Sequence, residues 1–163
     1  MTDSLSGAAS GSISKLVSTA TAGVHSAVLT GVDRAGNVQS RSCGYTVVVP
    51  KCQGMTPTIL GTGGNDAITG TPGIDVVHAL SGADKVDGLR AGDKLCGGEG
   101  VDVIKAGGGA DTVDGGGGND DIAGGAAADT LDGGAGSDSI RGDDGPDRCT
   151  SGEVRMSSCA VIY

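Results

Sequence analysis

The stretch GGGGNDDIA at residues 115–123 places four glycines and three polar residues ahead of a single isoleucine. A run of glycines is typical of a flexible linker, because glycine adopts more backbone conformations than any other residue. A linker, however, has no reason to hold an aliphatic residue at a fixed distance from an aspartate. The neighbouring sequence decides whether this stretch is a spacer or one unit of a regular structure.

Aspartate recurs every nine residues on both sides of Asp120, through ten units that abut without insertion from residue 61 to residue 150. We number each unit 1 to 9, with the aspartate at position 6. Position 8 is aliphatic, except for Cys149 in the last unit, and position 4 is glycine except at Ala91 and Ala127. A strict period overrides the linker or disordered-tail interpretation that composition alone favours. The ten aspartates are Asp66, Asp75, Asp84, Asp93, Asp102, Asp111, Asp120, Asp129, Asp138 and Asp147.

Charge and composition divide the chain into two parts. The 163 residues have 1% aromatic content and a net charge of −9, so an ordinary packed core is not expected. Residues 61–150 hold 17 acidic and 6 basic side chains, a net charge of −11. Such a segment repels nucleic acid and anionic membranes and attracts cations. No apolar run approaches the length of a membrane span. We therefore expect neither nucleic-acid binding nor membrane insertion.

Each unit has the pattern of six turn residues followed by three strand residues. Side chains alternate between the two faces of a strand, so position 8 points inward and positions 7 and 9 point outward. The turn glycines allow positive φ and bring main-chain carbonyls close to one point, where the aspartate adds a carboxylate. Hard oxygen ligands on a flexible frame suit Ca²⁺.

Units such as GGEGVDVIK (97–105) and GGGGNDDIA (115–123) resemble the RTX or hemolysin-type calcium-binding repeat, G-G-x-G-x-D-x-U-x with U aliphatic. The resemblance covers 90 of the 163 residues. It implies an all-β fold, a parallel β-roll in which two units make one coil, and hence about five coils. It also implies a calcium ion between each turn and the turn stacked on it, and a segment that stays unfolded in low calcium and folds outside the cell. A solenoid that stacks without metal is the alternative.

The resemblance places the turns in two columns, with eight calcium sites as the ceiling. Ala91, Ala127, Pro72 and Pro146 all fall in the second column. A Cβ is unfavourable where the backbone needs positive φ, so we predict tighter calcium binding along the first column. The candidate metal ligands are the ten aspartates and the position-4 glycines of that first column, namely Gly64, Gly82, Gly100, Gly118 and Gly136.

Residues 21–49 predict two strands joined by the turn DRAGN at 33–37. This pair resembles the last two strands of a bacterial Ig-like domain, but fifty residues are too few for a complete sandwich. We expect the upstream strands to be missing, through a misplaced start or because the chain is a fragment. The expected organisation is a partial Ig-like segment at 1–50, a linker at 51–60, the β-roll at 61–150 and a C-terminal cap at 151–163.

The five cysteines include a pair, Cys149 and Cys159, that brackets nine residues directly after the last unit. We predict a disulfide between them that caps the end of the roll. Cys43 and Cys52 form a second candidate pair, unless Cys43 has lost its partner with the missing strands. Cys96 is at an outward position. No zinc-type Cys/His spacing is present. Calcium and disulfides together favour an oxidising, extracellular location.

The leading hypothesis is a secreted or cell-surface calcium-binding β-roll with a structural, adhesion or secretion role. No motif supports catalysis, so we do not expect an enzyme, and Ca²⁺ is the expected cofactor. The alternative is that this chain is the C-terminal part of a larger secreted enzyme or toxin. A protein or cell-surface partner is not identified by the sequence.

Overall fold

The computed structural model describes residues 23–32, 38–150 and 159–161. It divides into two compact units, Met1–Val49 and Pro50–Tyr163, which we describe separately. The first contains an antiparallel pair, β1 (Gly23–Val32) and β2 (Val38–Val47), in register from Gly23↔Val47 to Val32↔Val38. This pair confirms the two strands predicted within residues 21–49. The DRAGN turn lies outside the described residues, as do residues 1–22.

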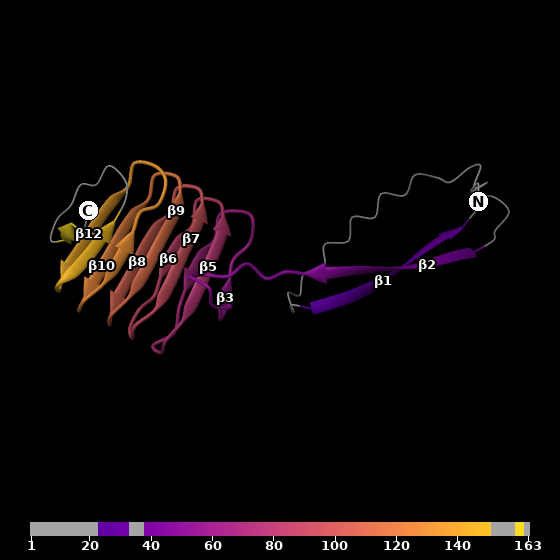
Figure 1. Cartoon of the computed structure of the whole chain (residues 1–163), viewed down its shortest axis with the longest axis horizontal. Coiled ribbons are helices and arrows are strands. Elements are labelled where there is room, and N and C mark those ends of the chain that lie inside the picture. Colours follow the sequence, from indigo (N-terminus) through magenta and orange to yellow (C-terminus); the bar gives the residue numbers. More distant parts are fainter. Residues whose placement is uncertain (1–22, 33–37, 151–158, 162–163) are drawn as a thin grey trace. The chain divides into compact units, whose positions relative to one another are not determined.

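The second unit is a solenoid of two parallel sheets that face each other (Figure 1). One sheet has five strands in the order β12-β10-β8-β6-β4, and the other has seven in the order β14-β13-β11-β9-β7-β5-β3. No helix is present among the described residues, so none there could cross a membrane. The five-stranded sheet contains β4 (Ala67–Thr69), β6 (Lys85–Asp87), β8 (Val103–Gly108), β10 (Asp121–Ala126) and β12 (Ser139–Asp144). The seven-stranded sheet contains β3 (Ile59–Leu60), β5 (Val76–Ser81), β7 (Lys94–Glu99), β9 (Thr112–Gly117), β11 (Thr130–Asp132), β13 (Asp147–Thr150) and β14 (Cys159–Val161).

Strand pairing follows the sequence period. Ile104 pairs with Ile122, and Ile122 with Ile140, so neighbouring strands are 18 residues apart in the sequence. The other sheet keeps the same offset, as Leu95↔Val113 shows. Two units thus form each coil, and the ten units form about five. This confirms the predicted all-β fold and the parallel β-roll.

The core between the sheets consists of the position-8 side chains together with Ala79 and Ala106 at position 1. Those from Val77 to Cys149 are 0–3% exposed, and Ile68 at the open end packs against them partly buried. The predicted outward residues, such as Lys85, Asp87 and Lys105, are exposed or half-buried. The alternation inferred from the sequence therefore holds along the roll.

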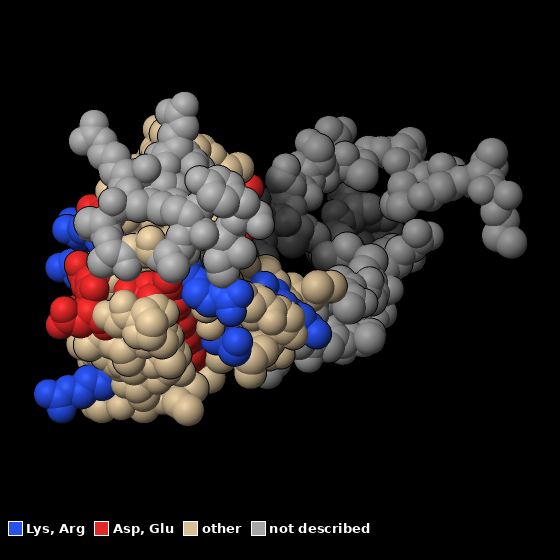
Figure 2. Space-filling model, turned by 60° about the vertical axis from the view of Figure 1, so that its left-hand side comes forward, with Lys and Arg blue, Asp and Glu red and all other residues tan. Residues whose placement is uncertain are grey.

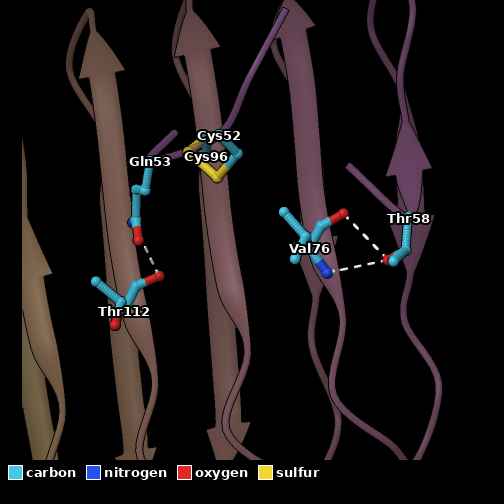
Figure 3. The surroundings of a disulfide bond; sticks show 6 residues. All are labelled: Cys52, Gln53, Thr58, Val76, Cys96 and Thr112. Carbon is cyan, nitrogen blue, oxygen red and sulfur yellow. Dashed lines mark hydrogen bonds between the residues drawn. A yellow bond between two sulfur atoms is a disulfide. The ribbon is translucent and has the colours of Figure 1, made fainter. Parts of the chain in front are cut away.

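Both disulfides lie on the second unit. Cys149 bonds to Cys159, as predicted, and β14 pairs with β13 beside this bond. The Cys43–Cys52 pairing is wrong, because Cys52 bonds to Cys96. The segment around Cys52 crosses the outer face of the seven-stranded sheet and meets Cys96 there (Figure 3). The outward position of Cys96 is thus covered, and the residue is only 6% exposed.

Residues 51–60, expected as a linker, contribute to the roll. Cys52 and Met55 exchange two main-chain hydrogen bonds of 2.9 and 3.0 Å, and β3 pairs in parallel with β5. Residues 151–158 of the expected C-terminal cap lie outside the described part of the chain. The boundaries of the four expected segments stay predictions.

We predict that Ile122→Ala destabilises the folded roll by about 2–5 kcal/mol, because Ile122 is fully buried in the core between the two sheets. Ile74→Ala is the matched control, since Ile74 is 75% exposed and its truncation should change stability by less than about 0.5 kcal/mol. Denaturant unfolding of both variants under identical conditions measures the difference. Equal losses would contradict the assignment of position 8 to the core.

Candidate metal centre

The position-6 aspartates line the turns on the two sides of the roll, and they are buried. Nine of them are 0–4% exposed, a burial that is rare for carboxylates unless they are paired or bind metal. Asp66 in the first unit is half-buried. The period therefore places all ten predicted aspartates at equivalent points of successive turns, in two columns. The first column holds Asp66, Asp84, Asp102, Asp120 and Asp138, and the second holds Asp75, Asp93, Asp111, Asp129 and Asp147.

Within each column, one carboxylate oxygen ties each coil to its neighbour. The main-chain N–H of Asp102 donates to Oδ1 of Asp120 at 2.9 Å, and the N–H of Asp120 donates to Oδ1 of Asp138 at 3.0 Å. The same bond joins eight pairs in total, at distances between 2.7 and 3.0 Å. Oδ1 thus has a structural partner in every unit from the third to the tenth.

The second carboxylate oxygen has no such partner. Oδ2 is buried and accepts no hydrogen bond in eight aspartates, and burying a polar atom in this way is unfavourable by several kcal/mol unless an ion or water is bound. This number equals the ceiling of eight sites set by the two columns. The eight are Asp84, Asp93, Asp102, Asp111, Asp120, Asp129, Asp138 and Asp147.

Main-chain carbonyls converge on the same oxygens. A Cβ added to Gly115, at position 1, would lie 2.5 Å from Asp120 Oδ2 and 2.6 Å from the Gly133 carbonyl oxygen of the next coil. At Gly124 the corresponding distances are 2.5 Å to Asp129 Oδ2 and 2.8 Å to the Gly142 carbonyl oxygen. A Cβ at position 1 would therefore collide with a carboxylate oxygen and a carbonyl oxygen that flank the same point. The period alone does not reveal this role of position 1, which alanine fills in two other units.

Burial and mutual repulsion raise the pKa of these carboxyl groups. Burial is the largest cause at Asp111 and Asp120, and neighbouring aspartates of the same column add to it, bringing each pKa to about 6. Hydrogen bonds from the main-chain N–H groups of Asp93 and Asp102 oppose the rise only in part. Burial likewise raises the pKa of Asp93, Asp102 and Asp129. The columns are thus sites where negative charge accumulates with only partial compensation from main-chain N–H groups.

The donor set restricts the kind of metal. Within the described residues, no three His, Cys, Asp or Glu side chains come close enough together to hold a metal ion by themselves. A cation held here takes carboxylate and carbonyl oxygens, which is the chemistry of Ca²⁺. Figure 2 shows Asp and Glu side chains gathered on one face, with Lys and Arg side chains beside them. One such pair is Arg141 Nη2 and Asp121 Oδ1, at 3.8 Å.

The turns adopt the predicted positive φ from the third unit onward. Gly82, Gly100, Gly118 and Gly136 have φ between 131° and 139°, whereas Gly64 in the first unit does not have positive φ. Gly82, Gly100 and Gly118 also bond to the next turn, as the Gly100 N–H does to the Gly117 carbonyl at 2.6 Å. The position-4 glycines thus shape the turns, and their role as metal ligands stays a prediction.

The two columns differ in backbone strain. Ala91 and Ala127 occupy position 4 of the second column with φ of 72° and 89°, and Leu89 and Asp143 at position 2 add φ of 73° and 65°. The first column has one non-glycine residue with positive φ, Leu80. Left-handed backbone is unfavourable by about 1–2 kcal/mol for a residue with a Cβ. The asymmetry inferred from the two alanines is therefore present in the backbone.

In the first two units, Oδ2 of the aspartate does have hydrogen-bond donors. They come from two threonines whose role the period did not predict. Asp66 Oδ2 accepts hydrogen bonds from the Thr62 N–H and hydroxyl, at 2.7 and 2.9 Å. Asp75 Oδ2 accepts the same pair from Thr71, at 2.6 and 3.0 Å. The signal was available, since threonine occurs at position 2 in these two units alone.

No curated protein matches the chain. The family model of the RTX calcium-binding nonapeptide repeat (4 copies) matches residues 60–95, 96–131 and 115–149, which together span 90 of the 163 residues. The matched segment contains every aspartate of the two columns. The chain therefore belongs to the family of RTX calcium-binding nonapeptide repeat proteins, and the metal of its repeats is Ca²⁺.

Proposed function

We propose that this chain is a secreted or cell-surface calcium-binding protein whose roll folds when calcium binds, with a structural or adhesion-type role. The eight buried Oδ2 atoms without a hydrogen-bond donor carry the proposal. The ligands are the eight position-6 aspartates whose Oδ2 has no donor, together with main-chain carbonyls of the turns. A site assembled from stacked coils does not exist in the unfolded chain, so binding energy becomes folding energy.

Two further features support an extracellular setting. Both disulfides hold the roll, and such bonds persist in oxidising compartments. The antiparallel pair β1–β2 agrees with the two strands on which the Ig-like resemblance rests. Members of this repeat family are typically exported, which agrees with the same setting.

Calcium titration tests the central claim. We expect the chelated protein to lack the β-sheet circular dichroism of the roll and to gain it as calcium is added. Asp120→Asn should raise the calcium midpoint of this transition by about tenfold or more, because ligand charge sets calcium affinity. Asp121→Asn is the control, since the adjacent Asp121 is exposed and pairs with Arg141. Full β structure in excess chelator would overturn the proposal.

The strain in the second column gives a separate prediction. Ala127→Gly should lower the calcium midpoint about two- to fivefold, because relief of left-handed strain of about 1–2 kcal/mol outweighs the entropy of glycine, about 0.5–1 kcal/mol. Ala126→Gly, at the adjacent position without positive φ, should raise the midpoint instead. Isothermal titration of both variants with calcium measures the effect. If Ala127→Gly bound calcium more weakly than the unmodified chain, the prediction that strain weakens calcium binding in the second column would be contradicted.

The pKa shifts predict how the metal-free chain responds to acid. The carboxyl groups of Asp111 and Asp120 titrate near 3.8 when unfolded and near 6 in the roll, so the folded form binds protons more tightly. Their contribution to stability is complete below pH 3.8 and is lost as the pH rises through about 6. In excess chelator, circular dichroism should therefore show more β structure at pH 4.5 than at pH 7.5. The opposite trend would contradict this linkage.

A further inference from the structure

Residues 52–60 have the length and register of one more repeat unit. The nine residues CQGMTPTIL lie immediately before the first unit, and they place Ile59 at position 8. Ile59 pairs with Val77 and Leu60 with His78, at the same offset of 18 residues that separates neighbouring strands elsewhere in the roll. Ile59 also packs partly buried against the core. This segment therefore occupies a coil position, although only its last residue, Leu60, lies within the family match.

Pro57 stands at position 6 of this segment, where every later unit has aspartate. In the next coil, the Asp75 N–H donates to Asp93 Oδ1. Proline has no N–H, so Pro57 cannot donate the equivalent bond to Asp75 Oδ1. The hydroxyl of Thr58 takes this place. It accepts the Val76 N–H at 3.0 Å and lies 3.4 Å from Asp75 Oδ1. The ladder of aspartates thus ends on a hydroxyl rather than on another carboxylate.

In the following two units, neutral hydrogen-bond donors contact the Oδ2 atoms that we assign to a cation in the later units. Asp66 and Asp75 each receive an N–H and a hydroxyl on Oδ2, from Thr62 and Thr71. Among the ten position-6 aspartates, these two alone lack an orphaned Oδ2. The threonine hydroxyls also lie 3.3 and 3.2 Å from the N–H groups of Gly64 and Gly73, so they hold their own turns. Neither turn has positive φ at position 2 or position 4.

A disulfide fastens this end of the roll. Cys52 is fully buried against Cys96 in β7, while Gln53 Nε2 donates to the Thr112 carbonyl in β9 at 3.2 Å. Thr58 bonds to β5 (Figure 3). The segment that begins the roll is therefore anchored to β9, β7 and β5 before it enters the sheet as β3.

We propose that residues 52–78 form an N-terminal cap that binds no calcium, in which threonine donors replace the metal at Asp66 and Asp75, and on which the calcium-dependent coils stack. Solenoids generally need terminal units that differ from the internal ones. A unit of the internal kind would be unsuited to the start of the roll. Its carboxylate would be the last of its column and face solvent, so no metal could be held there between two turns. The inference rests on the proposed function, since it assigns calcium to the remaining eight aspartates.

Calcium stoichiometry tests this assignment. Asp75→Asn and Asp111→Asn are a matched pair, since both residues are buried in the second column. We expect Asp111→Asn to bind at least one calcium ion fewer than the unmodified chain in equilibrium dialysis. Asp75→Asn should bind the same number, with a calcium midpoint within about twofold, because asparagine retains an oxygen that accepts from Thr71.

The outcomes separate the two proposals. If Asp75→Asn and Asp111→Asn each bind at least one calcium ion fewer than the unmodified chain, the cap is overturned and the proposed function stands. No loss from either variant would overturn the ligand assignment of the proposed function and the cap with it. Should Asp75→Asn fail to fold, Thr71→Val replaces it. That variant removes the hydroxyl at Asp75, and we expect a lower thermal midpoint with an unchanged number of calcium ions. A lost ion would overturn the cap, and an unchanged thermal midpoint would contradict the role of Thr71.

Discussion

The roll depends on one carboxylate performing two tasks. From the third unit onward, Oδ1 of each column aspartate accepts the main-chain N–H of the aspartate one coil earlier, and this bond sets the stacking of the turns. The same geometry buries Oδ2 without a donor. Stacking and charge accumulation are therefore inseparable, because each added coil brings both a new hydrogen bond and a new buried negative charge. A cation resolves the second without disturbing the first, which is why a hard metal suits this fold.

The rest of the unit follows from that constraint. Stacked turns lie so close that a Cβ on Gly118 would collide with the carbonyl oxygen of Gly100. From the third unit onward, the turn also reverses direction with positive φ at positions 2 and 4. Glycine satisfies both conditions, and alanine at position 4 satisfies the second only with strain. With so much of the unit given to the turn, one large inward side chain per unit is left for the core, as Ile122 and Leu131 illustrate.

The sequence period was enough to predict the repeated part of the structure. A step of nine fixed the register of the strands, the inward position of Ile122 and the column to which Asp120 belongs, since each depends only on local alternation and on stacking of like units. The period also predicted where left-handed backbone would meet a Cβ, at Ala91 and Ala127. These features repeat, so every unit supplied independent support for them.

What the sequence did not reveal lies where the repetition stops. Cys52 finds Cys96 because its segment doubles back across the outer face of the sheet, and no local pattern encodes that path. Residues 52–60 lack both the aspartate and the position-4 glycine, so the pattern of the later units does not identify them. The threonines at Asp66 and Asp75 were visible, but their meaning required knowing that Oδ2 elsewhere has no donor.

The two ends of the roll show different answers to the same problem of an exposed parallel edge. At the start, hydroxyl donors and a disulfide close the column that later units leave to the metal. At the other end, β14 pairs with β13 and is held by the Cys149–Cys159 bond. The five-stranded sheet instead ends at β12, whose exposed Asp143 and Asp144 place charge on the edge strand. Charge on an edge strand discourages pairing with another chain. Carboxylates thus need a cation inside the roll, whereas on its edge strand their exposed charge protects against pairing with another chain.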